Sequence, residues 1–499
     1  MSAAQVVDWV SAAARVQFPK GMFVDGRQVG ADSGETFTVI GPRDGRAIAS
    51  LPEASAAELD QAVAAARRAF DAGVWRNRRP AERRAVMVKL SELIDRERAS
   101  LALLDSLCMG APITMTHDHC VQWAIDSFRW YGEAIDKVYD EVAPTGPGVV
   151  ALIKREPVGV VGLVLPWNWP AGMLGWKVPP ALASGNSVVL KPDEQSSLSA
   201  IRIAELALEA GVPPGVFNVV TGGARLGEAM GRHRGIDVIA FTGSTAVGAR
   251  FLRYSGESNA KPVWLELGGK SPNIIFADAP DLAAAAQTAA FAIFMNSGQV
   301  CAAGSRLLVQ NSVLDRVLQG VTGTASIFAP ADPLSATTLM GPLAKREQFD
   351  RVLGYIDAGR QAGARVACGG AATRQETGGF YIQPTIFHGV SNDMRIAREE
   401  IFGPVLSVIG FDTEEEAVRI ANDSEYGLAA GLWTANLARA HRVSSALRCG
   451  TVSVNVYGTD APELTVPFGG YKGSGFGRDK SLHAIDKYVQ LKTVWMATT

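Results

Sequence analysis

The chain has 499 residues, of which 47% are hydrophobic and 20% charged, and its formal net charge is −2. A chain of this length is predicted to form two to four domains or lobes with a sizeable buried core. The near-neutral charge offers no electrostatic attraction to nucleic acid or to an anionic membrane surface. We therefore expect neither as a partner.

The cysteines and the first residues bear on the compartment. Five cysteines are scattered along the chain without a CxxC pair, which argues against a disulfide framework and fits a reducing environment. Residues 1–10 lack a basic region followed by an apolar core, and no run of about 18 uncharged apolar residues follows them. We predict a cytoplasmic protein with no signal peptide and no membrane span.

The first 110 residues are predicted to be mainly helical. Residues 57–72 and 81–107 have the apolar spacing of helices. Between them, residues 76–84 form a basic turn that we interpret as solvated surface.

From residue 158 onward, short β-branched runs alternate with helix-length segments. The predicted strands are 158–165, 187–191, 216–220, 238–241 and 262–267, and the helices among them are 199–210, 225–231 and 246–254. The helix over 199–210 ends at Gly211 with Pro213 behind it, which is typical of a helix C-terminus. This alternation indicates βαβ units and a parallel sheet.

A second alternating set begins near residue 273. Its predicted strands are 307–310, 405–411, 428–433 and 451–455, and its helices include 349–362 and 437–447. Two α/β lobes are the natural division. Residues 149–154 and 489–495 are alternating apolar strands outside either lobe, and such lone strands usually pair elsewhere, often in another subunit.

One cysteine has the surroundings of a reactive thiol. Cys301 lies among small residues directly after an amphipathic apolar run over 282–294. Helical N–H groups nearby are expected to lower its pKa, and small neighbours let a carbonyl substrate approach. A free cysteine is more often a small core residue, so the assignment depends on other motifs.

Two further motifs bring polar groups to strand ends. Glu266 begins the segment Glu-Leu-Gly-Gly-Lys-Ser-Pro (266–272), and a glutamate near a cysteine suggests a base for water attacking a thioester, although such residues are more often surface charges. Asn168 lies in Pro-Trp-Asn-Trp-Pro (166–170) at the carboxyl end of the first strand. Open α/β sheets bind ligands at that end.

Seven segments in one order resemble the aldehyde dehydrogenase superfamily. They are 166–170, Lys-Pro-Asp-Glu (191–194), Phe-Thr-Gly-Ser-Thr (241–245), 266–272, the Cys301 segment, Glu-Glu-Ile-Phe-Gly-Pro (399–404) and Pro-Phe-Gly-Gly-Tyr-Lys (467–472). The resemblance extends from about residue 20 to the C-terminus. Each motif alone is weak, but their shared order is a strong signal.

The resemblance implies a catalytic set. Cys301 resembles the nucleophile, Glu266 the general base, and Asn168 with the Cys301 backbone N–H the oxyanion hole, in which one donor is typically worth about 3 kcal/mol. The implied reaction is the NAD-dependent, non-acylating oxidation of an aldehyde to the carboxylic acid. It proceeds through a cysteine thiohemiacetal and a thioester hydrolysed by glutamate-activated water.

The resemblance also implies an atypical dinucleotide site, since no GxGxxG segment follows a predicted strand. Ser244 and the start of the next helix are placed to contact pyrophosphate. Lys191 and Glu194 resemble the adenosine-ribose contacts, and Glu400 and Phe402 the nicotinamide-ribose contacts. Further cofactor residues are Pro166, Trp167, Gly243, Gly268, Gln348 and Lys177. NAD is expected over NADP, because the charge of Glu194 meets the 2′-phosphate.

The segments that resemble the substrate tunnel are mostly apolar or aromatic. They contribute Trp169, Met173, Trp176, Met295, Val300, Ala302 and Phe468, which favours a hydrophobic aldehyde, aliphatic or aromatic. Residues 457–466, at the expected entrance, run a residue or two longer than the family pattern leads us to expect.

The predicted fold is α/β, with two Rossmann-like open-sheet lobes, one for the cofactor and one catalytic, plus a small β oligomerisation element. The cofactor domain is predicted at 1–127 and 151–265, the catalytic domain at 266–470, and the oligomerisation element at 128–150 and 484–499. The resemblance implies a homodimer or homotetramer.

Several alternatives fit the sequence less well. Residues 269–271 resemble the tail of a P-loop, but Trp264 stands where its first glycine belongs. His117, His119 and Cys120 are metal-capable, yet no second ligand cluster follows, so no metal is expected. A coenzyme A-acylating enzyme would not need Glu266. A non-catalytic protein that keeps the fold is the remaining alternative.

Overall fold

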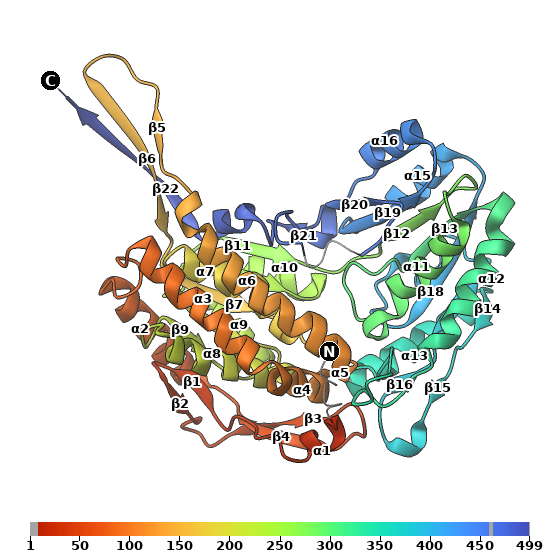
Figure 1. Ribbon diagram of the computed structural model, residues 1–499, viewed down its shortest axis with the longest axis horizontal. Helices are drawn as coiled ribbons and strands as arrows, with labels where there is room; N and C mark the ends of the chain where they lie inside the picture. Colours follow the sequence, from red (N-terminus) through yellow and green to blue (C-terminus); the bar gives the residue numbers. More distant parts are fainter. Residues whose placement is uncertain (1–7, 459–462, 499) are drawn as a thin grey trace, which may run out of the picture.

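The computed structural model describes residues 8–458 and 463–498. Two large sheets lie side by side with helices packed on them, and a narrow three-stranded arm projects from the first lobe beside the C-terminus (Figure 1). The predicted α/β class with open, mostly parallel sheets is therefore confirmed. None of the described helices is long and apolar enough to cross a membrane.

The first sheet has the strand order β2-β1-β9-β8-β7-β10-β11-β21. Its strands are β1 (Met22–Val24), β2 (Arg27–Val29), β7 (Val160–Val164), β8 (Ser187–Lys191), β9 (Phe217–Val219), β10 (Val238–Thr242), β11 (Val263–Glu266) and β21 (Gly475–Phe476). Strands β7 to β11 are parallel and almost wholly buried, since helices cover both faces. The chain order reverses between β7 and β10, which makes their carboxyl ends the expected ligand crevice.

Helices of the first lobe fill the βα connections and the N-terminal layer. They are α1 (Trp9–Ala13), α2 (Ala56–Asp71), α3 (Pro80–Arg96), α4 (Arg98–Met109), α5 (Ile113–Met115), α6 (Val121–Ala134), α7 (Pro170–Ala183), α8 (Leu198–Ala210), α9 (Ala224–Arg232) and α10 (Thr245–Gly256). The single helix predicted over 81–107 is wrong. It breaks at Glu97 (φ −99°, ψ 10°), whose carboxylate lies 2.7 Å from Nη2 of Arg202 on α8.

The second sheet has the order β14-β17-β18-β13-β12-β19-β20 and is parallel except at β14. Its strands are β12 (Pro272–Ile275), β13 (Arg306–Gln310), β14 (Arg365–Cys368), β17 (Thr385–His388), β18 (Val405–Phe411), β19 (Ala429–Trp433) and β20 (Thr451–Val454). Its helices are α11 (Leu282–Phe294), α12 (Leu314–Ala325), α13 (Arg346–Gln361), α14 (Arg395–Arg398), α15 (Glu414–Asn422) and α16 (Leu437–Ala446). The chain crosses between the sheets through residues 267–271.

Three small sheets complete the fold. β3 (Thr36–Ile40) pairs with β4 (Ala47–Pro52), and β15 (Ala372–Thr373) pairs with β16 (Tyr381–Ile382). In the arm, β6 (Val149–Pro157) lies between β5 (Glu141–Ala143) and β22 (Val489–Ala497). The two strands predicted to lie outside either lobe pair with each other within the chain, in register from Val489 opposite Pro157 to Ala497 opposite Val149.

Candidate active site

A cavity of about 600 Å³ opens at the carboxyl ends of β7 and β10, where the strand order reverses. It is lined by loops and helices of both lobes. Among the predicted site residues, the lining includes Cys301 and Asn168; Pro166, Trp167, Gly243, Ser244, Gly268, Gln348, Glu400 and Phe402; and Trp169, Met173, Trp176, Val300 and Phe468. Within the described part of the chain, the lining does not include Glu266, Lys191 or Glu194.

The Cys301 segment is held in an unusual backbone conformation. Asn296 and Ser297, just ahead of it, both adopt left-handed φ values of 50° and 55°, which cost energy in residues other than glycine and cluster at functional sites. Gly298 follows with φ 72°, and a Cβ there would lie 2.1 Å from the carbonyl oxygen of Gly403. Close packing of this turn against the loop before β18 thus fixes where Cys301 lies.

Asn168 is clamped by the same turn. Its Nδ2 donates to the carbonyl of Gln299 at 2.8 Å, and Nδ2 of Asn296 donates to the carbonyl of Asn168 at 2.9 Å. The side chain is buried at the N-terminal end of α7 and lines the cavity with Cys301. An amide held this firmly is a preorganised donor, which is what stabilisation of a developing oxyanion requires.

The Cys301 thiol is not acidified by its surroundings in this structure. Desolvation, followed by the carboxylates of Glu400 and Glu266, raises the pKa of Cys301 to about 12, against the backbone N–H groups of Ala302 and Cys301 itself. The expectation of a lowered pKa is therefore wrong here. Two N–H dipoles are weaker than the loss of water and two nearby negative charges.

Glu266 ends β11 in a buried charged cluster. Lys177 of α7 pairs with Oδ2 of Asp479 at 2.8 Å, and Lys487 donates to the other oxygen of Asp479. Burial and the charge of Asp479 raise the pKa of Glu266 well above its usual value, while Lys177, Lys487 and Arg478 oppose the rise. Neither carboxylate oxygen of Glu266 has a hydrogen-bond partner among the described residues. The group is therefore poised to accept a proton.

Lys177 does not reach the cofactor cavity, contrary to the expectation from sequence. Its ammonium is buried against Asp479, and its side chain is only 1% exposed. Gln348 does line the cavity, and its amide nitrogen donates to the carbonyls of Ile401 and Phe402 at 2.9 and 2.8 Å. It thereby holds in place the loop that carries Glu400 and Phe402.

The polar side of the cavity fits a dinucleotide. Ser244 caps α10 by accepting a hydrogen bond from the N–H of Val247, so the N-terminus of a twelve-residue helix faces the crevice, and such ends attract phosphate. A Cβ at Gly268 would lie 2.2 Å from Oε2 of Glu400. The carboxylate of Glu400 thus packs directly against the backbone of residue 268, where only glycine leaves enough room.

Lys191 and Glu194 lie further along the same edge, at the end of β8. Nζ of Lys191 is 3.9 Å from Oε2 of Glu194. A second lysine joins them, because Nζ of Lys345 lies 3.2 Å from Oε1 of Glu194 and 2.7 Å from Oδ1 of Asp193. Sequence reasoning missed Lys345, which belongs to none of the motifs.

Aromatic rings form the other side of the cavity. The centroids of Trp123 and Trp169 lie 4.8 Å apart, those of Trp123 and Trp176 6.1 Å, and those of Trp176 and Phe468 5.3 Å. Met173, Met295, Val300 and Ala302 complete this wall. Such a surface offers stacking and apolar contact to a substrate.

The comparisons with known proteins agree with this geometry. The sequence pattern of the aldehyde dehydrogenase family matches residues 29–494. This chain belongs to the aldehyde dehydrogenase family. It oxidises aldehydes with NAD(P) as the cofactor of the family.

Three relatives of this aldehyde dehydrogenase are informative. The NADP/NAD-dependent aldehyde dehydrogenase PuuC of Escherichia coli is 47% identical over 98% of both chains. The structure of AldA, an indole-3-acetaldehyde dehydrogenase of P. syringae with NAD+ and IAA, is 52% identical with a TM-score of 0.97 and covers 98% and 99% of the two chains. The γ-glutamyl-γ-aminobutyraldehyde dehydrogenase of Burkholderia cenocepacia is also 52% identical, with a TM-score of 0.97 and 99% coverage of both.

Several cavity residues of this aldehyde dehydrogenase are not predictable from its motifs. His119 and Trp123 reach the cavity from a π-helical stretch (Thr116–Cys120) and from α6, and Phe291 reaches it from α11. The π-helical stretch, a feature frequent at functional sites, has no sequence signature. Tyr457 donates to the carbonyl of Ala302 at 2.8 Å. Part of the expected entrance, residues 459–462, lies outside the described residues.

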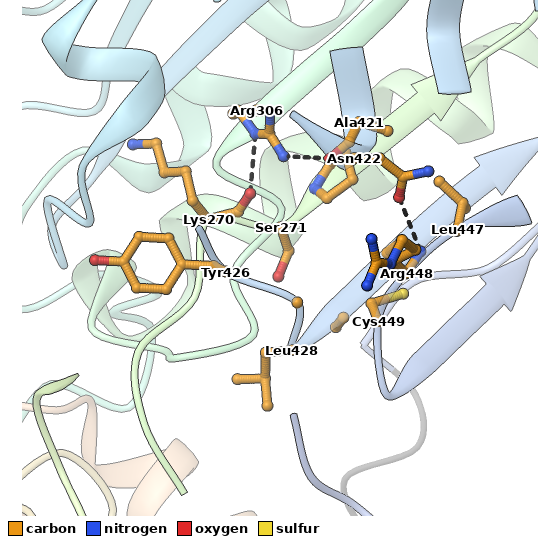
Figure 2. A pocket seen from close by; sticks show the side chains of 14 residues that line it. Lys270, Ser271, Arg306, Ala421, Asn422, Tyr426, Leu428, Leu447, Arg448 and Cys449 are labelled. Carbon is orange, nitrogen blue, oxygen red and sulfur yellow. Dashed lines mark hydrogen bonds between the residues drawn. The ribbon is translucent and has the colours of Figure 1, made fainter. Parts of the chain in front are cut away.

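A small cavity in the second lobe is structural and has a volume of about 10 Å³, room for about one water. Figure 2 shows Arg306 donating beside it to the carbonyls of Lys270 and Ala421, at 2.9 Å in each case. Burial lowers the pKa of Arg306 to about 10 and that of Lys270 to about 7. Neither Arg306 nor Lys270 lines the cavity that contains Cys301, although the charge of Lys270 acts on Glu400, which does.

Proposed function

We propose that this enzyme oxidises a hydrophobic aldehyde, with preference for an aromatic side chain, to the carboxylic acid. The sulfur of Cys301 attacks the aldehyde carbonyl and forms a thiohemiacetal. The developing oxyanion is stabilised by Nδ2 of Asn168 and by the backbone N–H of Cys301. The clamping of Asn168 by the turn 296–299 supports this role, since it sets the donor before the substrate arrives.

The cofactor site is assigned to the polar side of the cavity. Ser244 and the N-terminus of α10 are proposed to hold the pyrophosphate, Lys191 and Glu194 the adenosine ribose, and Glu400 and Phe402 the nicotinamide ribose. Bound NAD(P) supplies the hydride acceptor that converts the thiohemiacetal to a thioester. The fit of a glycine-lined helix N-terminus to phosphate supports the assignment.

Deacylation is assigned to Glu266. Its raised pKa makes the ionised carboxylate a stronger base toward water than an ordinary glutamate. Because the carboxylate lies outside the cavity lining, beside Gly469, it must turn toward Cys301 to activate that water. Attack of this water on the thioester carbonyl breaks the bond between carbon and the sulfur of Cys301, so the acyl group leaves as the carboxylic acid and the thiol is regenerated. Water is thus the acyl acceptor, and the reaction is non-acylating.

The observation that carries the substrate proposal is the aromatic wall of Trp123, Trp169, Trp176 and Phe468. Among the described lining residues the one carboxylate is Glu400, on the cofactor side. Two relatives equally similar to this enzyme are named for an indole aldehyde and for an aminobutyraldehyde derivative. The wall favours the first kind of substrate.

A matched pair of aldehydes tests this. Phenylacetaldehyde and 3-aminopropanal are compared by kcat/KM in NADH formation at pH 7.5, with acetaldehyde as the minimal substrate. We expect phenylacetaldehyde to exceed both by at least about tenfold, from aromatic contact and burial. Equal or higher values for 3-aminopropanal would contradict the substrate class, whereas no NADH from any aldehyde would contradict the reaction.

The arm is proposed to join subunits into a homodimer or homotetramer. Leu491 and Trp495 on one face of its sheet are 64% and 67% exposed, and Val142 on the opposite face is 71% exposed; large exposed apolar side chains on a projecting arm favour burial against another subunit. The chain has a mass of 52.8 kDa. Light scattering at micromolar concentration should give at least twice this mass, and a monomer would contradict the proposal.

We also propose a domain division and a compartment. The sequence divides the chain into a cofactor domain at 1–127 and 151–265, a catalytic domain at 266–470 and an oligomerisation element at 128–150 and 484–499. We propose the same three parts with the arm shifted along the chain, because α6 of the first lobe runs to Ala134 and β6 of the arm runs to Pro157. The passage of the chain between the two sheets at 267–271 supports the division. All five cysteines are free, which supports a cytoplasmic location.

A further inference from the structure

At the carboxyl end of β8, two ammonium groups and two carboxylates form one cluster. Lys191, Asp193 and Glu194 belong to the first lobe, whereas Lys345 directly precedes α13 of the second. Lys345 contacts both carboxylates, at 2.7 Å from Asp193 and 3.2 Å from Glu194. The charge at the end of β8 is therefore set by both lobes.

Open α/β sheets recognise the adenosine ribose at this position. An acidic residue at the end of the second strand accepts the ribose hydroxyls of NAD, and a basic side chain nearby accommodates the 2′-phosphate of NADP. Glu194 follows the turn 166–170 by one helix and one strand, α7 and β8. This chain supplies the acidic group in Glu194 and a basic group on each side of it.

The charges of this cluster are balanced. Burial opposes ionisation of Glu194, yet the ammonium groups of Lys345 and Lys191 outweigh it and keep the pKa of Glu194 below its usual value. Burial also disfavours charge on Lys345, but Asp193 and Glu194 keep the pKa of Lys345 above its usual value. Both groups are therefore ionised at neutral pH.

Lys345 and Glu194 are also accessible to a ligand. The side chain of Lys345 is 20% exposed and that of Glu194 is 42% exposed, whereas the side chain of Lys191 is only 6% exposed. Burial lowers the pKa of Lys191. Of the two lysines, Lys345 is thus the more exposed and the one whose charge is better secured.

We propose that Lys345 is a specificity-determining residue that lets this enzyme accept NADP as well as NAD. Its ammonium offsets the charge of Glu194 and pairs with a 2′-phosphate that Glu194 alone would repel. In the NAD complex, Lys345 keeps its contact with Asp193 while Glu194 accepts the ribose hydroxyls. The inference rests on the proposed ribose site at Lys191 and Glu194.

The test uses two ligands that differ only in the 2′-phosphate, 2′,5′-ADP and 5′-AMP. Their affinities are measured by calorimetry on the intact enzyme, so no turnover is needed. In Lys345→Met, the preference for 2′,5′-ADP over 5′-AMP should fall about ten- to a hundredfold, as expected for losing one charge contact in a partly wet site. In Lys345→Arg, the preference should stay within about threefold of wild type.

Two further variants separate the possible outcomes. Arg346→Met removes the same charge at the next residue, where Arg346 pairs with Asp350 at 3.1 Å, and should leave the preference unchanged. Glu194→Gln should weaken 5′-AMP and favour 2′,5′-ADP.

An unchanged preference in Lys345→Met overturns the role of Lys345. If Glu194→Gln nevertheless shifts the preference, the ribose site stands without Lys345. If neither variant changes either affinity, the ribose site itself is wrong. Loss of 5′-AMP binding in Lys345→Met together with an unfolded circular dichroism spectrum would mean misfolding. Lys345→Gln, which removes the charge but keeps a polar side chain, then carries the same expectation: a fall in the preference supports the role of Lys345, and an unchanged preference overturns it.

Discussion

Two regions meet near Cys301, and they differ in whether cations compensate the acid that each contains. The cavity that Cys301 lines is open and walled by aromatic rings, whereas the cluster around Glu266 is closed and holds Lys177, Asp479 and Lys487. Both regions raise the pKa of the acid they contain. For Cys301 the causes are desolvation and two carboxylates, while for Glu266 burial and Asp479 are opposed by nearby cations.

The difference indicates that the two regions serve different steps, attack on the aldehyde at Cys301 and activation of water at Glu266. A thiol in an apolar cavity stays protonated until substrate and cofactor change its surroundings, which protects it from unwanted reactions. The carboxyl group of Glu266 lies near two lysines, Lys177 and Lys487, whose positive charges favour its ionised form and so help it to give up its proton. The following variants act on one region at a time.

The largest effect is expected for Cys301→Ala. Without the sulfur no covalent intermediate forms, so turnover should fall on the order of 10⁴-fold or more, while dinucleotide binding persists. Steady-state NADH formation measures the turnover, and calorimetry with NAD measures the dinucleotide binding. Cys449→Ala, at a half-buried thiol of the second lobe, is the matched control. Turnover within about tenfold of wild type would remove Cys301 from the mechanism.

Glu266→Gln should separate the two half-reactions. Formation of the thioester requires Cys301, Asn168 and bound cofactor but not Glu266. One equivalent of NADH should therefore form rapidly per active site before turnover stalls, and kcat should be lower by about 10²- to 10⁴-fold. Stopped-flow absorbance measures the burst and the steady state. An equal loss in both phases would show that Glu266 acts before the thioester forms, as the group that activates Cys301. The two regions would then act in the same step of the reaction.

Lys487→Met should shift a pH profile. Lys487 favours the ionised form of Glu266, so its loss raises that pKa further, and the ionised base becomes scarcer below the new pKa. The ascending limb of kcat should therefore move up by about one pH unit and recover at high pH. The control is Lys89→Met, at an exposed lysine of α3. Uniformly lower activity with an unchanged midpoint would give Lys487 a structural role only.

The smallest effect is expected for Trp176→Leu, which keeps the cavity apolar but removes a ring stacked near Phe468 and Trp123. For phenylacetaldehyde, kcat/KM should fall by about three- to tenfold, whereas acetaldehyde should be little affected. Trp130→Ala, at a half-buried tryptophan of α6, is the control. Equal losses for both aldehydes would show that Trp176 supports the fold and does not sort substrates.

Local features of the chain follow from its sequence alone. The apolar β-branched runs of β8 and β18 match the predicted strands 187–191 and 405–411 residue for residue, because strands buried on both faces consist of continuous apolar segments. The turns that carry Asn168, Ser244 and Cys301 are marked by their motifs. The interrupted helix at Glu97 is not marked in this way, and the pairing of its carboxylate with Arg202 of α8 is a long-range contact.

Long-range contacts were decided only by the tertiary structure. Lys345 and Glu194 are 151 residues apart in sequence, and Lys177 and Asp479 are 302 apart; no local pattern announces either pair. The pairing of β6 with β22 joins segments from the middle and the end of the chain. The pKa of Cys301 likewise depends on which groups displace water around the sulfur. Residue types and spacing therefore specify the chemistry available, while desolvation and charge, which set its strength, follow from what folding brings together.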